Sequence, residues 1–274
     1  MFECVINISE GRHRVLLDEL RVTAGDSLRD LHADAFHNRS VFTLINDAEG
    51  LPRDVRALIS QSFQLLDLRT HEGVHPRFGV VDVVPFVALD QQESSISLEM
   101  RDATAQWISD TFDVPVFLYG PVQDHVRTLP EVRKRAFADL TPDYGPPTPS
   151  PTLGAVAVGA RPILIAWNLW LSDVSRDEAR VIAKAIRRNE VRALAFRAGE
   201  HMQVSCNLID PLVVAPSTVY DEVTALLPVG AEIVRAELVG LVPRVVLERE
   251  ERSRWVQLGL SEGQTIESRL EDRL

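Results

Sequence analysis

Residues 79–87 constrain the fold of this 274-residue chain more than any other segment. They read Gly-Val-Val-Asp-Val-Val-Pro-Phe-Val, a mainly apolar and β-branched run bounded by glycine and proline. Such a run is typical of a strand buried in a sheet. We therefore expect a β-sheet core here, and a loop formed by the residues that lead into this strand.

Strand-like and helix-like patterns alternate along the rest of the chain. Residues 12–22, for example, place Leu16, Leu17, Leu20 and Val22 on the apolar side of an amphipathic helix. The same reasoning predicts strands at residues 2–8, 28–33, 40–45, 114–120, 163–167, 192–196 and 203–208, a strand and turn at 232–241, and helices at 53–66, 93–112, 176–188 and 218–227. Because these units alternate and include antiparallel-looking pairs, we predict an α/β (α+β) protein with mixed sheets.

Composition limits the partners and the location. The chain is 45% hydrophobic and 25% charged, which is ordinary for a globular protein of one or two domains. Its formal net charge of −11 argues against a nucleic-acid partner, since binding to phosphates needs a surplus of Lys and Arg on one face. No run approaches the roughly 18 apolar residues of a membrane helix, and the start lacks the pattern of a signal peptide. We expect a cytoplasmic protein with no membrane partner.

The loop before the central strand is dense in chemical groups. Residues 71–79 carry two imidazoles, a carboxylate and a guanidinium beside two glycines, and 71–75 spell H-E-x-x-H. On a helix that string binds zinc, with the glutamate as base. Pro76 disfavours helical geometry at His75, however, and Gly73 weakens a helix further. A turn that carries functional side chains is therefore the favoured interpretation.

These motifs resemble the glutamate formimidoyltransferase family, folate enzymes of histidine degradation. The opening Glu-Cys-Val-Ile-Asn-Ile-Ser-Glu-Gly of residues 3–11, the loop and strand just described, and several later segments carry the resemblance, in order, from about residue 3 to about residue 245. It implies a transferase domain without the cyclodeaminase domain of the bifunctional members. Two consecutive α/β subdomains are expected, at 1–159 and 160–248, with mixed sheets, helices on the outer faces, a substrate tunnel between them, and a homodimer. The Glu- and Arg-rich residues 249–274 are expected to form a solvated charged tail.

The resemblance also implies a catalytic residue. The family's acid/base is the histidine of the His-Pro-Arg step, which is His75 here. The expected reaction moves a formimino group from formiminoglutamate to N5 of tetrahydrofolate, or a formyl group between 5-formyltetrahydrofolate and glutamate, with tetrahydrofolate as co-substrate and no metal. A histidine suits this reaction because its ordinary pKa of roughly 6.5 lets it accept and donate protons near neutral pH. Asp82 is expected behind it, orienting the ring.

Binding residues are implied at several further places. The Pro- and Gly-rich residues 140–154 predict a long irregular loop, either a domain linker or the family's folate-binding loop with 145–154 as its core. We favour the binding loop. The substrate- or folate-binding residues implied are His32, Asp34, Asn38, Arg39, Arg77, Gly145, Pro146, Gly154 and Arg161. The arginines among them have to make local positive pockets for anionic substrates in an acidic chain.

Two departures from the family pattern leave alternatives open. Val74 stands before His75 where the family usually has glutamate, and His32 replaces an acid that Asp34 would have to stand in for. An imidazole does not supply a fixed negative charge, so substrate, rate or pH optimum can differ. One alternative is a protein that binds folate or an acidic metabolite without turnover. The other is a zinc hydrolase that uses His71, Glu72 and His75, with His32 or His37 as a further ligand.

Overall fold

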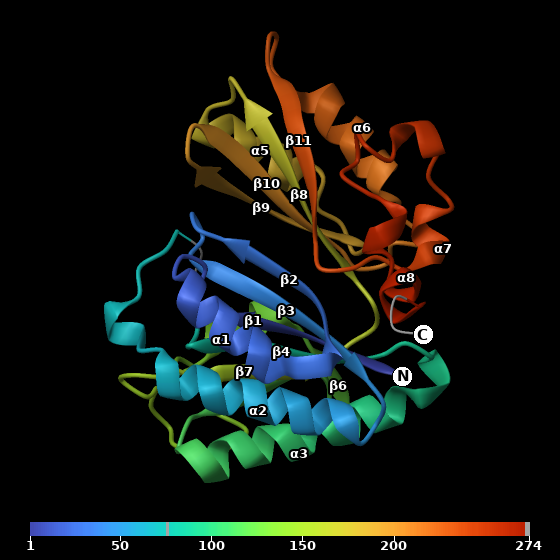
Figure 1. Ribbon diagram of the computed structural model, residues 1–274. Coiled ribbons are helices and arrows are strands. Elements are labelled where there is room, and N and C mark those ends of the chain that lie inside the picture. Colours follow the sequence, from blue (N-terminus) through green and yellow to red (C-terminus); the bar gives the residue numbers. More distant parts are fainter. Residues whose placement is uncertain (75–76, 272–274) are drawn as a thin grey trace. The chain divides into compact units, whose positions relative to one another are not determined.

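The computed structural model describes residues 1–74 and 77–271 (Figure 1). The chain divides into two compact units, unit 1 (Met1–Pro162) and unit 2 (Ile163–Leu274). Each unit has its own sheet, of seven strands in unit 1 and four in unit 2. The predicted mixed α/β fold is therefore confirmed. Within the described ranges, no helix has the length and apolar character needed to cross a bilayer.

The sheet of unit 1 is mixed, with the strand order β2-β3-β1-β4-β7-β5-β6. β1 is antiparallel to both β3 and β4, whereas β7 is parallel to both β4 and β5. The strands are β1 (Phe2–Ile8), β2 (Leu28–Asp34), β3 (Arg39–Asn46), β4 (Val81–Ala88), β5 (Val116–Val122), β6 (His125–Arg127) and β7 (Val156–Ala160). The register between β1 and β4 shifts next to Ile8, which marks a bulge beside the start of β4.

Helices cover the two faces of this sheet unequally. The long helices α1 (Arg14–Ala24), α2 (Gly50–Leu65) and α3 (Ser94–Phe112) pack on one face, with Leu20, Leu58 and Ile108 in a shared core (Figure 1). The short helix α4 (Leu129–Arg135) packs through Val132 against Val83 and Phe117, which face the other way. α4 begins with a capping box in which Thr128 and Glu131 satisfy each other's backbone N–H groups. Short 3-10 turns lie at Gly25–Ser27, Leu68–Thr70 and Gln91–Glu93.

Unit 2 is an antiparallel sheet in the order β11-β8-β10-β9. Its strands are β8 (Ile165–Ser172), β9 (Val191–Ala198), β10 (His201–Leu208) and β11 (Glu232–Val239). The helices α5 (Arg176–Ala185) and α6 (Pro216–Leu226) share its apolar core through Ile182 and Val219. The helices α7 (Arg244–Leu247) and α8 (Ile266–Glu271) and the 3-10 turns Arg252–Arg254 and Glu262–Gln264 follow.

The structure corrects two expectations. Residues 156–160, for which the sequence patterns predicted no strand, form β7 between β4 and β5 of the unit 1 sheet; their small side chains gave little strand signal. The C-terminal segment is not simply a solvated tail, because Leu258 and Leu260 belong to the unit 2 core. The Leu258 carbonyl also accepts a hydrogen bond from the Trp167 indole at 2.8 Å. The charged residues at the start of this segment concealed the apolar residues in its middle.

Candidate active site

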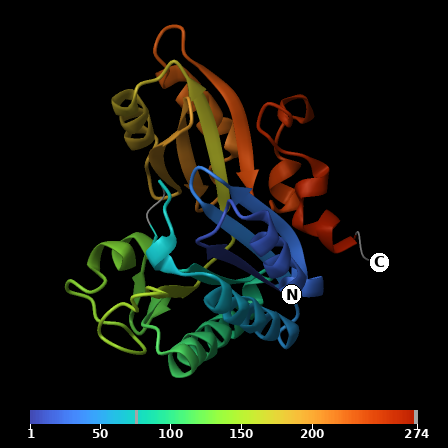
Figure 2. The ribbon, with the colours of Figure 1, turned by 60° about the vertical axis from the view of Figure 1, so that its left-hand side comes forward.

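Several loops of unit 1 meet at one end of its sheet, which we call the loop end. β1 and β2 finish at the loop end and β3, β4, β5 and β7 begin there, given the pairing directions described above. The segment between α2 and β4, cyan in Figure 2, approaches the hairpin between β2 and β3. The loop end therefore gathers residues that lie far apart in the sequence.

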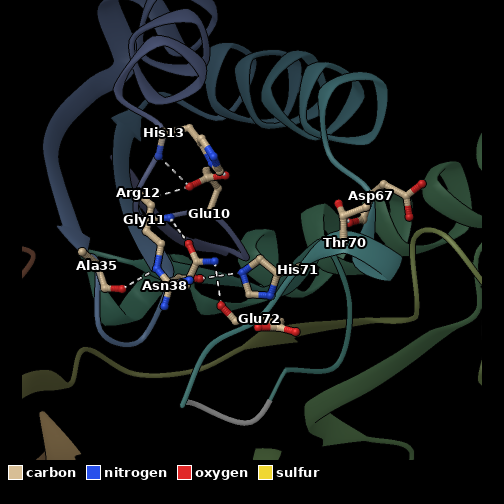
Figure 3. A network of polar contacts seen from close by, with 10 residues as sticks. All are labelled: Glu10, Gly11, Arg12, His13, Ala35, Asn38, Asp67, Thr70, His71 and Glu72. Carbon is tan, nitrogen blue, oxygen red and sulfur yellow. Dashed lines mark hydrogen bonds and ion pairs between the residues drawn. The ribbon is translucent and has the colours of Figure 1, made fainter.

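Asn38 joins three of these loops (Figure 3). Its side-chain Oδ1 accepts from Gly11 N at 2.9 Å, and its Nδ2 donates to Glu72 O at 2.9 Å. Its backbone oxygen contacts His71 Nε2 at 2.8 Å. The backbone of Asn38 is left-handed, with φ of 48°, a conformation that asparagine tolerates better than most residues. A residue predicted to bind substrate thus also fixes the shape of the loop end.

Glu10 organises the loop that follows β1. Its Oε1 accepts from the backbone N–H groups of Arg12 at 2.7 Å and His13 at 2.9 Å, and its Oε2 lies 2.7 Å from His13 Nδ1 (Figure 3). Burial alone would raise the Glu10 pKa, but these hydrogen bonds outweigh it and lower the pKa. Arg12 Nε donates in turn to Ala35 O at 2.8 Å. Sequence patterns did not mark Glu10 for this role, because the usual turn acid is aspartate and not glutamate.

The predicted residues of the hairpin have mostly local contacts. Asp34 Oδ1 accepts from the backbone N–H groups of Phe36 at 2.7 Å and His37 at 2.8 Å, so this carboxylate closes the hairpin turn. His37 Nε2 lies 3.9 Å from Asp34 Oδ2. His32 lies on β2 opposite Val41 of β3. Substrate binding by Asp34 and His32 stays a prediction.

His71 begins an extended segment and not a helix. Its backbone has φ of −92° and ψ of 126°, so the helix that a zinc-binding H-E-x-x-H string requires is not formed at His71. Its Nε2 faces a carbonyl oxygen and therefore carries the proton, while Nδ1 is buried with no hydrogen-bond partner among the described residues. Burial lowers the His71 pKa. His75 and Pro76 lie outside the described residues, and the described ones contain no group of three or more potential metal ligands.

Arg77 closes the loop that carries His75. Its Nη2 donates to His71 O at 2.7 Å and its Nη1 to Gly73 O at 3.4 Å. These bonds tie the residues on both sides of position 75 together. The guanidinium predicted to meet substrate therefore also holds its own loop together, through the backbone of His71 and Gly73.

Asp82 holds two arginines behind this loop. Its carboxylate is fully buried, and Oδ1 accepts from Phe78 N at 2.6 Å. Oδ2 accepts from both Arg39 Nη1 and Arg133 Nη2. Burial alone would raise the Asp82 pKa, but the two guanidiniums reverse this effect and lower it to about 2. Arg133, on α4, was missed because sequence alone does not show which arginine of a short helix turns inward.

The proline-rich loop returns to the start of β4. Ala155 N donates to Phe78 O at 3.0 Å and Val80 N to Leu153 O at 2.9 Å. Gly154 has φ of 73°, and a Cβ there would stand 2.5 Å from the Phe78 oxygen, so this approach requires glycine. At Gly145, with φ of 86°, a Cβ would stand 2.8 Å from the oxygen of Val114, which precedes β5, and half-buried Pro146 follows it. The predicted folate loop thus lies at the loop end.

The comparisons with known proteins fit this arrangement. Residues 1–161 match the family model for the formiminotransferase domain, N-terminal subdomain. The chain belongs to the formiminotransferase family. The family resemblance and the expectation of an enzyme of this family are thereby confirmed. Each site residue described so far lies inside the matched range.

Relatives extend the match beyond that subdomain. A glutamate formimidoyltransferase of Streptococcus pyogenes serotype M1 is 36% identical over 200 residues, which cover 68% of this chain and 67% of the relative. A glutamate formimidoyltransferase of Thermoplasma acidophilum is 30% identical over 99% of this chain and 97% of the relative. A formimidoyltransferase-cyclodeaminase of Rattus norvegicus is 31% identical over 89% of this chain but only 50% of its own length. The chain thus spans about half the length of such bifunctional relatives.

Arg161, the last residue of the range that matches the formiminotransferase subdomain, lies apart from the other candidates. It follows β7, and its backbone N–H donates to Phe86 O at 3.1 Å. β7 runs away from the loop end, so its length, on the order of 16 Å, separates Arg161 from Gly154. The Arg161 guanidinium instead interacts with Glu3 and Tyr119, and its positive charge favours the ionised form of both side chains. Burial of Glu3 raises its pKa to about 7, and Arg161 offsets this only in part.

The protein should therefore lose stability with rising pH through Glu3. A carboxyl whose folded pKa is about 7 against an ordinary 4.5 binds more protons folded than unfolded between those pH values. Glu3→Gln removes the buried ionisable group. We expect the free energy of unfolding of the variant, measured against that of wild type at the same pH, to be about 1–3 kcal/mol higher at pH 8 than at pH 4. Urea unfolding across this pH range measures the difference. Glu99→Gln, on the exposed side of α3, controls for the change in net charge, and parallel profiles for wild type and Glu3→Gln would contradict the expectation.

Proposed function

We propose that this chain transfers a formimino group from N-formimino-L-glutamate to N5 of tetrahydrofolate. The match to the formiminotransferase subdomain over residues 1–161 carries the proposal. Relatives named glutamate formimidoyltransferase, one of them covering nearly the whole chain, support it. A formyl transfer between 5-formyltetrahydrofolate and glutamate uses the same pair of carriers and is the second reaction to test.

His75 would move the protons of this reaction. N5 of the folate attacks the amidine carbon of the donor, the bond from that carbon to the glutamate nitrogen breaks, and the formimino group becomes bonded to N5. The attacking nitrogen loses a proton and the departing nitrogen gains one, so a single histidine can accept the first and return it to the second. The Arg77 clamp on His71 and Gly73 supports this role, because a catalytic group works best in a fixed position.

The remaining assignments belong to the same proposal. Folate would contact the loop of 145–154, whose glycines bring it beside Phe78. Asn38, Arg39 and Arg77 would border the reacting groups, and Asp82 would act behind them. We further propose subdomain ranges of 1–159 and 160–248 and a cytoplasmic homodimer.

A turnover assay tests the reaction directly. Purified protein is given formiminoglutamate with tetrahydrofolate, or 5-formyltetrahydrofolate with glutamate, and product is followed by absorbance. Turnover with the first pair, lost when either substrate is omitted, is the expected result. No turnover with either pair, despite folate binding by folded protein, would reject the transferase in favour of a binding protein. Stoichiometric zinc in protein purified without added metal would favour the hydrolase instead.

A further inference from the structure

The charges around Asp82 do not balance. One carboxylate oxygen serves two guanidiniums, those of Arg39 and Arg133, and the other oxygen is taken by the Phe78 N–H. The Asp82 side chain is fully buried, and those of Arg39 and Arg133 are 13% and 24% exposed. One positive charge in this largely enclosed cluster is therefore left without a counter-charge from Asp82. Such a charge is favourable only where solvent or an anion meets it.

Arg133 has hydrogen-bond donors to spare. Among the described residues, its guanidinium contacts Asp82 through Nη2, which leaves Nε and Nη1 without a partner there. Arg127, also in unit 1, differs: it is matched by Asp143 at 2.6 Å and donates to Leu118 O as well. A guanidinium offers its N–H groups as a planar fork that fits the two oxygens of a carboxylate. Asp82 holds Arg133 at one corner of the guanidinium, and no other residue in the described part of the chain hydrogen-bonds to the rest of the fork.

The cluster lies directly beside the loop that carries the proposed catalytic residue. Phe78 donates its N–H to Asp82, and its neighbour Arg77 clamps the loop at His71 and Gly73. The unused donors therefore stand next to the segment where the reaction is proposed to occur. In a chain with a net charge of −11, an anionic ligand needs a local positive charge of this kind.

We infer that Arg133, with Arg39 beside it, forms a receptor for a carboxylate of a glutamyl group, and that Asp82 holds the two guanidiniums in place. The inference rests on the proposed function, since both carriers of that reaction bear a glutamyl carboxylate. The amino-acid substrate has one, and so does the glutamate tail of the folate. Arg133 belongs to α4, and neither the sequence motifs nor the family resemblance identified this arginine as a binding residue.

Binding measured by calorimetry tests the assignment without requiring turnover. L-glutamate and 5-formyltetrahydrofolate are titrated into wild type, Arg133→Gln, Arg133→Lys and a matched control, Arg135→Gln. Arg135 lies on the same helix, is 48% exposed and pairs with Asp139 on the surface. We expect Arg133→Gln to raise the Kd of one ligand by ~10- to 100-fold, because a hydrogen-bonded charge is lost. Arg133→Lys should lose less, because it keeps the charge but not the fork.

Kinetics separate a binding role from a structural one. A receptor that binds a carboxylate of the substrate and takes no part in the proton transfers should raise KM for one substrate and change kcat at saturation by less than about 3-fold. If Arg133 had only a structural role, its replacement would instead lower kcat and thermal stability together and would weaken the binding of both substrates. Arg135→Gln should match wild type in both measurements.

The outcomes also distinguish the two ligands. A weaker glutamate titration assigns the receptor to the amino-acid substrate, and a weaker folate titration alone assigns it to the folate tail. Changes of less than about 2-fold for both ligands would overturn the assignment, while wild-type turnover would leave the proposed reaction standing. A wild-type protein that neither binds nor turns over these substrates would remove the proposed function and this receptor with it.

Discussion

Replacing His75 with alanine should lower kcat by about 10²- to 10⁴-fold, the usual contribution of a general acid–base group. The variant lacks the group that would take the proton from the attacking nitrogen and return it to the departing one. Substrate binding should change far less, because proton transfer matters only in the reaction step. Steady-state rates with formiminoglutamate and tetrahydrofolate, beside calorimetric titrations with 5-formyltetrahydrofolate, measure the two effects separately.

His125→Ala is the matched control for this experiment. His125 is exposed on β6, away from the loop end, so its loss should leave both rate and binding near wild type. A His75→Ala variant that keeps more than about a tenth of the wild-type kcat would contradict the assigned role. Equal losses in both variants would point to a general loss of folded protein.

Replacing Asp82 with alanine should lower the free energy of unfolding by about 3–5 kcal/mol, which is typical for removing one partner of a buried ion pair. The change leaves the Arg39 and Arg133 guanidiniums facing each other without their shared carboxylate and frees the Phe78 N–H. Urea unfolding at pH 7 measures the loss. Asp139→Ala removes a carboxylate that is 66% exposed and pairs with Arg135, so it should cost at most about 1 kcal/mol.

The same carboxylate sets an acid limit on stability. The Asp82 pKa is about 2 in the folded protein against an ordinary 3.8, so the folded state binds fewer protons between these pH values. Its contribution is fully present above about pH 4 and is lost as the pH falls through 2. Asp82→Ala should therefore lose less stability than wild type on acidification through this range. A free energy of unfolding that falls as steeply with acidification in Asp82→Ala as in wild type would contradict this role of Asp82.

Sequence patterns located most strands of the unit 1 sheet but missed the interior strand β7. The β-branched residues of β4 and the amphipathic pattern of α2 carry local signals that survive in any tertiary context. β7 reads Val-Ala-Val-Gly-Ala, and its small residues become a strand only because β4 and β5 flank them. Leu258 and Leu260 were likewise hidden, since a charged run before them dominated the composition.

The candidate site was predictable as a set of loops but not as a set of contacts. The glycines, Arg77 and the asparagine of the hairpin marked segments that do meet at the loop end. Sequence did not show that Arg77 and Asp34 bond to their own loops, because a side chain's identity does not reveal whether its partner is backbone or ligand. The positions of Arg133 and Arg161 could not be predicted either. The position of Arg133 depends on which side of a short helix packs inward, and that of Arg161 depends on the direction in which β7 runs.

The position of β7 also governs how the first unit can be assembled. β7 is the last strand of unit 1 in sequence, yet it pairs with β4 on one side and β5 on the other. A chain emerging from the ribosome thus exposes two unpaired strand edges until residues 156–160 are made. Such edges invite pairing with other chains. A fragment cut before Val156 would lack the strand that joins the halves of its sheet, so useful truncations must extend beyond Ala160.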